Sequence, residues 1–415
     1  MADGAIRTPA LVVGPPRDTG DASSTGRGGP PGLVVVPDAV LAWTDGRVTY
    51  AGPSADAPAD AGAARVRGAV VPGFVDCHTH LPFVGWRADE FQARLAGRSY
   101  RDLQGGGGGG IYRSSRLFNQ ASDDDVIAFC LPLTAEMLEH GTTAFECKTG
   151  YGLSVEAELR QARLARRLGT LVPQTVTVTL LACHAVPPDW SRHDWVEAVC
   201  RDLIPAAAAD GLADAVDVFV EDIGFTGDDL RSVATVAADL GLPVRCHADQ
   251  LGPGGTAQIA AAIGAVSADH LNHTDEEGAR ALAASGTVAT VLPVSTLFLR
   301  ARRPPVAELF RAGARVAVAT DFNPGTSPCL SIPEAVAVAY SLYEMPVEAA
   351  VRGATAEAAR VLGVADRVGS LEPGKRADFV VLDSAEVASI PYRPGHNPVV
   401  QTWVSGAPVT SSTPA

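Results

Sequence analysis

The sequence lacks the segments that would place a protein in a membrane or carry it out of the cell. No stretch approaches the roughly 20 consecutive apolar residues of a membrane-spanning helix. The start, Met1-Ala2-Asp3-Gly4, has neither the basic residues nor the apolar core of a secretion signal. The seven cysteines are an odd number without zinc-finger spacing, which is typical of reduced thiols. These absences predict a cytoplasmic protein that binds no membrane.

Basic residues are in the minority. Lys and Arg number 33 against 47 Asp and Glu, so the formal net charge is -14. This balance argues against nucleic acid and against an anionic membrane as partners. The length of 415 residues is too great for one small core. It fits a (β/α)8 barrel of about 250 residues together with a second module.

The most informative motif is Cys77-His78-Thr79-His80, which directly follows the apolar run 70–76. Alternate side chains of an extended strand point to the same side, so His78 and His80 aim their imidazoles at one point. That is the geometry of a metal site, and its early position in a long α/β chain predicts the first strand of a barrel. The alternative for this motif alone is two polar residues that close a strand with ordinary hydrogen bonds.

Three further apolar runs end in side chains that can bind a metal. These terminal residues are His247, His270 and Asp321. A (β/α)8 barrel builds its active site at the carboxyl ends of its strands, so these side chains should meet there. The nitrogen and oxygen donors predict a hydrolytic centre with one divalent metal per chain, either zinc or ferrous iron. The expected ligands are His78, His80, His247 and Asp321.

The remaining chemistry follows from such an ion in a dry pocket, where it makes a bound water nucleophilic near neutral pH. Asp321 can accept the proton that this water loses. His270 is not needed as a ligand once the other four are counted. We therefore expect it to orient the water or to stabilise the developing oxyanion. The alternative for His270 is a core imidazole that is hydrogen-bonded to the backbone.

Between the two ends of the chain, strand and helix patterns alternate in the order that a parallel barrel requires, which predicts an α/β fold. Helices are expected over residues 154–168 and 230–240, where charged residues recur among apolar ones at helical spacing. The predicted barrel strands span residues 70–76, 142–146, 174–180, 215–220, 243–247, 265–269, 287–292 and 315–320.

The two ends of the chain carry short β-like runs separated by Gly, Pro and Asp. These runs span residues 33–36, 39–43, 47–52, 64–68, 378–383 and 399–406. They predict a small discontinuous β-sandwich, formed by residues 1–68 and 366–415, beside a barrel formed by residues 69–365. Residues 15–31 are expected to be a poorly ordered loop. Residues 105–110 are expected to be a flexible active-site loop, because no Lys-Ser/Thr pair follows to support a phosphate cradle.

Longer motifs extend through most of the chain. They include Pro72-Gly73-Phe74-Val75-Asp76-Cys77-His78-Thr79-His80, Gly97-Arg98-Ser99-Tyr100, Lys148-Thr149-Gly150-Tyr151-Gly152-Leu153, Cys183-His184-Ala185-Val186-Pro187, His247-Ala248-Asp249-Gln250 and Thr320-Asp321-Phe322-Asn323-Pro324-Gly325-Thr326-Ser327. Through these motifs the sequence resembles the imidazolonepropionases of histidine degradation, within the metal-dependent amidohydrolase superfamily. Lys-x-Gly-Tyr-Gly-Leu and Asn-Pro-Gly-Thr are much narrower signals than His-x-His and Thr-Asp, which the superfamily shares.

The resemblance implies a set of substrate contacts. They are Arg87, Tyr100, Tyr151, His184, Gln250, Asn323, Gly325 and Thr326. Arg87 lies seven residues after His80, where a guanidinium can clamp a carboxylate through two parallel hydrogen bonds. The alternative for Arg87 is a surface ion pair with Asp89 or Glu90. Tyr151 sits between two glycines, which suits a phenol presented to a ligand more than a core tyrosine.

Three positions depart from the related sequences. Related deaminases carry Glu three residues after the fifth-strand His, where it shuttles a proton, whereas this chain has Gln250. An amide cannot shuttle a proton, but it can hydrogen-bond a ring nitrogen or carbonyl. Gln250 therefore disfavours a deaminase, and we assign it to the site as a substrate contact and, with His270 and Asp321, as a catalytic residue. Thr149 replaces a common Ser and keeps the hydroxyl, and Leu297 replaces a common Tyr at the expected pocket floor.

The reaction implied by the resemblance is hydrolysis of the ring amide C–N bond of 4-imidazolone-5-propanoate to N-formimidoyl-L-glutamate. One alternative is an amidohydrolase or deaminase that acts on another small cyclic amide or aminated ring. Another is an inactive barrel that serves as a binding or scaffold protein, which the complete set of four expected ligands disfavours. The expected partner is a small molecule with a carboxylate. The sequence sets no oligomeric state, and a homodimer is one option.

Overall fold

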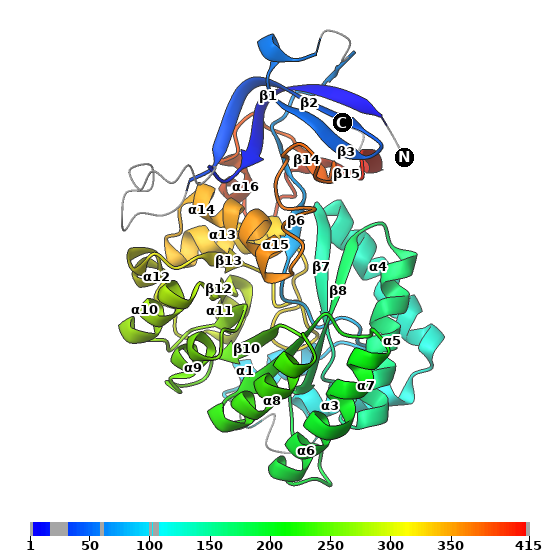
Figure 1. Ribbon diagram of the computed structural model, residues 1–415, viewed down its shortest axis with the longest axis vertical. Coiled ribbons are helices and arrows are strands. Elements are labelled where there is room, and N and C mark those ends of the chain that lie inside the picture. Colours follow the sequence, from blue (N-terminus) through cyan, green and yellow to red (C-terminus); the bar gives the residue numbers. More distant parts are fainter. Residues whose placement is uncertain (1–2, 17–31, 59–61, 99–101, 103–107, 412–415) are drawn as a thin grey trace.

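The computed structural model describes residues 3–16, 32–58, 62–98, 102 and 108–411, and it contains two eight-stranded sheets. One sheet forms a barrel surrounded by helices (Figure 1). The other is built from the two ends of the chain and lies above the barrel, beside both termini.

The barrel sheet contains parallel strands that pair in chain order. Its strands are β6 (Phe74–Asp76), β7 (Thr142–Lys148), β8 (Thr175–Cys183), β9 (Ala215–Val220), β10 (Val244–Ala248), β11 (Ser267–His270), β12 (Val288–Val291) and β13 (Val316–Val318). The first and last strands meet just past their ends, where Thr79 bridges Phe322 and the His80 amide donates to the Phe322 carbonyl at 2.9 Å. Seven of the eight predicted barrel strands are confirmed within a few residues, and the first is confirmed only in its second half, Phe74–Asp76.

The helices cover the outside of this barrel (Figure 1). They are α1 (Ala88–Leu95), α3 (Gly110–Gln120), α4 (Asp123–Glu139), α5 (Val155–Leu171), α6 (Arg192–Ala198), η2 (Val199–Leu203), α7 (Ile204–Ala209), α8 (Gly227–Asp239), α9 (Thr256–Ala262), α10 (Glu276–Ser285), α11 (Pro293–Leu299), α12 (Val306–Ala312), α13 (Ile332–Tyr343), α14 (Val347–Arg352), η3 (Gly353–Glu357), α15 (Ala358–Val361) and α16 (Ser389–Tyr392). Helices α5 and α8 confirm the two helical predictions. Each begins at a capping hydroxyl, that of Ser154 or Thr226, which accepts a backbone N–H from the first turn.

The predicted first strand is interrupted at Gly73. Residues Val70–Pro72 form β5, which belongs to the sheet of the chain ends, and only β6 joins the barrel. A Cβ at Gly73 would overlap the Thr143 side chain. Glycine therefore lets the chain cross from one sheet to the other in close contact with β7, and this crossing starts the barrel strand that delivers the histidine pair.

The sheet of the chain ends is a single curled sheet. Its strands are β1 (Gly4–Gly14), β2 (Val34–Thr44), β3 (Arg47–Pro53), β4 (Ala64–Arg65), β5, β14 (Phe379–Leu382), β15 (Val399–Val404) and β16 (Ala407–Ser411), with a short helical turn η1 (Ser54–Asp56) after β3. Two strands separate β2 from β14 in the sheet. Trp43 of β2 nevertheless lies 5.3 Å from Phe379 and 5.5 Å from Trp403, ring centroid to centroid, which shows that the sheet curls back on itself. The expected sandwich therefore arises as one sheet folded over an aromatic core.

Some predictions about the ends of the chain cannot be compared with the structure. Most of the predicted loop over residues 15–31, and residues 105–107 of the glycine run, lie outside the described residues. The division of the chain into residues 1–68 with 366–415 and residues 69–365 stays a prediction.

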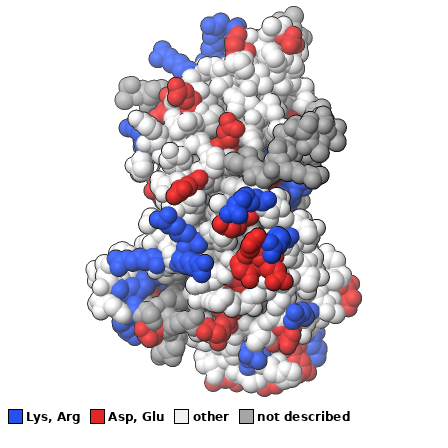
Figure 2. Space-filling model, turned by 90° about the vertical axis from the view of Figure 1, so that its left-hand side faces the viewer, with Lys and Arg blue, Asp and Glu red and all other residues white. Residues whose placement is uncertain are grey.

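The surface mixes charges of both signs. Figure 2 shows the side of the molecule that carries α10 and α12, where basic and acidic side chains lie next to one another. Two pairs on these helices are Arg280 with Glu276, at 2.6 Å, and Arg311 with Glu308, at 2.7 Å. Among the described residues, no helix combines the length and apolarity needed to cross a bilayer. All seven cysteines fall in the described part and are free thiols.

Candidate active site

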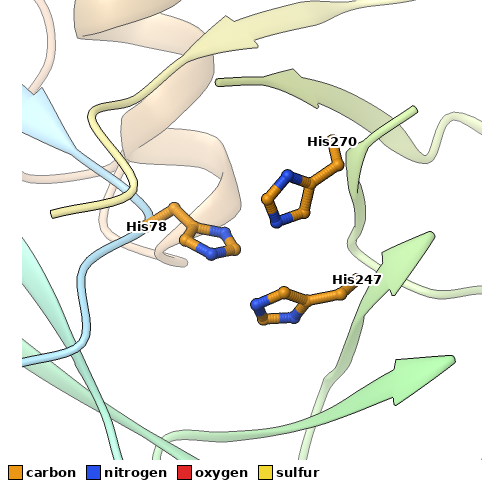
Figure 3. A group of neighbouring side chains, drawn as sticks. All are labelled: His78, His247 and His270. Carbon is orange, nitrogen blue, oxygen red and sulfur yellow. The ribbon is translucent and has the colours of Figure 1, made fainter. Parts of the chain in front are cut away.

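Buried polar side chains gather at the mouth of the barrel. They are His78 and His80 after β6, His247 in β10, His270 at the end of β11 and Asp321 after β13. Figure 3 shows the imidazoles of His78, His247 and His270 pointing toward one another. The ring centroids of His78 and His247 are 4.6 Å apart, and those of His247 and His270 are 5.2 Å apart. The structure thus brings the four predicted metal ligands and His270 together.

Two of these histidines are oriented by buried carboxylates. His78 Nδ1 lies 2.7 Å from Asp269 Oδ2, and His247 Nδ1 lies 3.1 Å from Asp217 Oδ1. Because a carboxylate accepts, each Nδ1 carries the proton and each Nε2 is left with a lone pair. Neither Nε2 has a hydrogen-bond partner among the described residues. A histidine held by a carboxylate with its other nitrogen free is the usual arrangement of a metal ligand.

The ligand atoms also lie close enough together for one ion. Two overlapping groups, His78 with His80 and Asp321, and His78 with His247 and His270, each have ligand atoms within 4.8 Å of one another. His80 Nε2 lies 3.2 Å from Asp321 Oδ1, and His78 Nε2 lies 3.6 Å from the same oxygen. This set of side chains fits a divalent metal. His270 belongs to one of the two groups, so distance alone does not separate a ligand role from an assisting role.

The environment controls the protonation of these groups. Burial lowers the pKa of His78 and His80 well below the usual range, which keeps both rings neutral and able to bind a cation. Burial lowers the pKa of His270 to about 3, so this ring is also neutral at pH 7. In His247, burial lowers the pKa but the Asp217 carboxylate raises it, with a net increase. Because a cation binds only the neutral ring, metal binding at His247 should weaken as the pH falls.

The backbone at the mouth of the barrel adopts a conformation that L-residues rarely take. His270 has a φ of 74°, and Asp321 has a φ of 57°. Left-handed backbone at non-glycine residues costs free energy and is concentrated at functional sites. Here the turn at each strand end aims a polar side chain across the barrel mouth.

A charged cluster that the sequence reading did not identify lies directly below the histidines. Lys148 Nζ lies 2.6 Å from Asp217 and 3.0 Å from Glu146, and Glu146 also pairs with Arg245. All four side chains are buried. Glu146 and Lys148 lie on β7, Asp217 lies on β9 and Arg245 lies on β10, and each charged residue has apolar neighbours in its strand. The only available signal was a charged residue inside an otherwise apolar strand, which is rare unless the charge is paired.

A cavity opens above the histidines. Its lining consists of His80, Arg87, Ile111, Tyr151, His184, Phe219, His247, Gln250, His270, Asp321, Asn323 and Thr326. Six of the eight predicted substrate contacts therefore face the same space as the predicted metal site. Ile111 and Phe219 also line this cavity and were not predicted. Phe219 stands in an apolar run and Ile111 is an isolated apolar residue at the start of α3, so sequence patterns do not distinguish either residue from core.

Arg87 is the unusual member of this lining. Its side chain is buried, and its Nε lies 3.7 Å from Glu90 Oε2. Neither Nε nor Nη1 has a hydrogen-bond partner among the described residues. Of the alternative, the ion pair with Glu90 is present but buried, so it is not a surface pair, and Asp89 pairs with Arg113 instead. A buried guanidinium with unused donors is matched to an anion.

The turn after β13 shapes the site around this guanidinium. The Arg87 amide donates to the Pro324 carbonyl at 3.1 Å, and a Cβ at Gly325 would overlap the guanidinium. Gly325 thus contributes by leaving room for Arg87. Asn323 Oδ1 accepts the amides of Gly325 and Thr326, at 2.9 and 2.7 Å, so its side chain holds the turn in shape.

Three further predicted contacts, Tyr151, His184 and Gln250, also line the cavity. The rings of Tyr151 and His184 are 5.6 Å apart, and His184 stacks on His80 with centroids 5.2 Å apart. The loop that carries Gln250 is fixed by Glu221, whose carboxylate accepts the amides of Gln250 and Leu251 at 2.5 and 2.9 Å. This leaves the Gln250 side chain to line the cavity.

Three other positions were singled out in the sequence. Tyr100 falls outside the described residues. Leu297 is 54% exposed on α11 and is absent from the cavity lining, so it does not form the pocket floor that the sequence suggested. The Thr149 hydroxyl accepts the Leu181 amide at 3.0 Å, which gives it a structural role between β7 and β8.

The sequence is similar to a known protein family and to curated proteins of one name. The model of the amidohydrolase family matches residues 69–409. A curated protein from Methylobacterium nodulans named imidazolonepropionase is 46% identical over 374 residues, covering 89% of this chain and 93% of its own length. A protein of the same name from Caulobacter vibrioides is 46% identical over 379 residues, covering 90% of this chain and 94% of its own length.

The fold is also similar to that of solved structures. The crystal structure of an adenosine deaminase from Xanthomonas campestris with bound zinc aligns with a TM-score of 0.70 at 20% identity. The alignment covers 99% of this chain and 93% of that one. At this identity the likeness establishes the fold alone.

Proposed function

The chain belongs to the imidazolonepropionase family of amidohydrolases, and we propose that it hydrolyses the ring amide C–N bond of 4-imidazolone-5-propanoate to N-formimidoyl-L-glutamate. The observation that carries this proposal is the buried Arg87 guanidinium with two unused donors, in the same cavity as the histidine cluster. A substrate with a carboxylate at one end and a hydrolysable ring at the other matches that pairing.

The proposed cofactor is one divalent metal per chain, either zinc or ferrous iron. His78, His80, His247 and Asp321 would hold it, since their donor atoms suit both ions. When bound, such an ion supplies Lewis acidity, which makes a water nucleophilic near neutral pH.

Asp321 and His270 would assist the hydrolysis step. The water oxygen forms the new bond to the ring carbonyl carbon, the C–N bond breaks, and the proton lost by water goes to the leaving ring nitrogen. Asp321 would take that proton first and pass it on, because its buried carboxylate lies at the proposed metal site, 3.2 Å from His80 Nε2, where the water would be held. His270, neutral at pH 7, can donate a hydrogen bond to the oxygen on which negative charge develops.

The other lining residues position the substrate. Arg87 would bind the propionate, and the Gln250 amide can hydrogen-bond a ring nitrogen or carbonyl. The Tyr151 and His184 rings form a wall against which a flat ring can lie, close to His80.

Replacing Arg87 with methionine tests the carboxylate contact. The propionate is bound in both ground and transition states, so the substitution should mainly raise KM, with a smaller fall in kcat from lost positioning. A charge-assisted contact contributes about 1.5 to 3 kcal/mol, which is roughly ten- to a hundredfold. Steady-state kinetics on 4-imidazolone-5-propanoate measures both constants.

Arg113→Met is the matched control, because Arg113 pairs with Asp89 outside the cavity, with 32% of its side chain exposed. It should leave both constants nearly unchanged. An imidazolone without the carboxylate should bind wild type and Arg87→Met almost equally. If wild type prefers that uncharged ring, the propionate contact is wrong.

A further inference from the structure

One buried cation touches the carboxylates that orient both histidines. Lys148 is the last residue of β7, and its side chain is fully buried. Its Nζ lies 2.6 Å from Asp217 Oδ2 and 3.8 Å from Asp269 Oδ2. Asp217 contacts His247 through Oδ1, its oxygen farther from Lys148. Asp269 contacts His78 through Oδ2, the same oxygen that lies near Lys148. A single ammonium thus lies behind two of the expected metal ligands.

We propose that Lys148 is a positioning residue that fixes Asp217 and Asp269 and thereby directs Nε2 of His247 and His78 toward one metal ion. This inference rests on the metal site of the proposed function. An aspartate buried on a strand can still turn about its own side-chain bonds. Contact with a fixed ammonium restricts that rotation, and the imidazole that donates to the carboxylate is restricted with it.

The contacts of Lys148 also show that it is not a metal ligand. Its ammonium has three protons and three carboxylates around it, those of Asp217, Glu146 and Asp269. A lysine engaged in this way offers no lone pair to a metal. It therefore supports the ligands from behind and does not join them.

Arg245 provides a matched comparison, because it is an equally buried cation in the same cluster. Its Nη1 contacts Glu146 and Thr179, and its Nη2 donates to the Val361 carbonyl at 2.8 Å. None of its hydrogen bonds reaches Asp217 or Asp269. If the cluster only balanced charge, loss of either cation should have the same effect on metal binding.

The test is the metal affinity of Lys148→Met, measured by competition with a chelator for zinc and without substrate. Loss of a group that orients metal ligands typically weakens metal binding ten- to a hundredfold, and we expect a loss in that range. The visible absorption of the cobalt-loaded protein should also shift, because two ligands are less well oriented. Arg245→Met should lower the melting temperature but leave affinity within about threefold of wild type.

A double variant distinguishes the loss of the Lys148 contacts from the change in the net charge of the cluster. Lys148→Met with Glu146→Gln restores the net charge of the cluster but not the contacts to Asp217 and Asp269. We expect its zinc affinity to stay as low as that of Lys148→Met. Recovery of wild-type affinity, or wild-type affinity and cobalt spectrum in Lys148→Met alone, would overturn the proposal. Because no substrate is present, these results stand apart from whether imidazolone propionate is the substrate.

Discussion

His78→Ala should yield a folded protein that retains no metal and shows no measurable turnover. His78 contributes a free Nε2 to both groups of potential ligands, so its loss disrupts either arrangement. The fold should persist, because the barrel core consists of packed apolar side chains that do not depend on an ion. Elemental analysis, circular dichroism and a turnover assay together measure the three outcomes.

His193→Ala is the control for this prediction, since His193 is an exposed residue on α6. It should match wild type in metal content and turnover. A His78→Ala protein that keeps one tightly bound metal would show that the ligand set is assigned wrongly.

His270→Ala should keep its metal and lose roughly a hundredfold or more in kcat, the usual scale for assistance by a positioned acid, base or hydrogen-bond donor. The reason is that the neutral ring stabilises charge in the transition state and is not required to hold the ion. Metal analysis and kcat on the same preparation distinguish the two roles.

Asp321→Asn provides the contrast, because it removes both a charged ligand and the proton acceptor. We expect it to lose metal as well as turnover. If His270→Ala is instead found without metal, His270 belongs among the ligands, as the group of His78, His247 and His270 permits.

The sequence predicted the barrel and the gathering of the histidines because both follow from local patterns. Short apolar runs form buried strands, and a parallel barrel places all their carboxyl ends on one face. His247 and His270 therefore had to lie near His78 once the strands were recognised. No long-range information was needed beyond the order of the strands.

The carboxylates behind the histidines could not be predicted in this way. Asp217 reaches His247 from the neighbouring strand, where His247 is in register with Phe219. Asp269 reaches His78 from β11, far along the sheet from β6. These contacts depend on how the sheet closes, so a period-two pattern within one strand carries no sign of them.

The sheet of the chain ends shows a second limit of prediction from sequence, which concerns proline. Strand β1 was not predicted, although its residues Ala10 to Val13 are apolar, because Pro9 lies within it. Proline within a run argues against a strand unless its missing N–H faces no partner. Similarly, Pro37 divided the sequence pattern of β2 into two runs, whereas the structure has one continuous strand.

The central claim is tested most directly by giving the metal-loaded protein 4-imidazolone-5-propanoate in water labelled with oxygen-18. Absorbance should report loss of the ring, and mass spectrometry should identify the product. The account predicts loss of the ultraviolet absorbance, N-formimidoyl-L-glutamate with one labelled oxygen in its new carboxylate, and no ammonia. Unchanged absorbance, together with hydrolysis of a neutral cyclic amide or release of ammonia from an aminated ring, would contradict it.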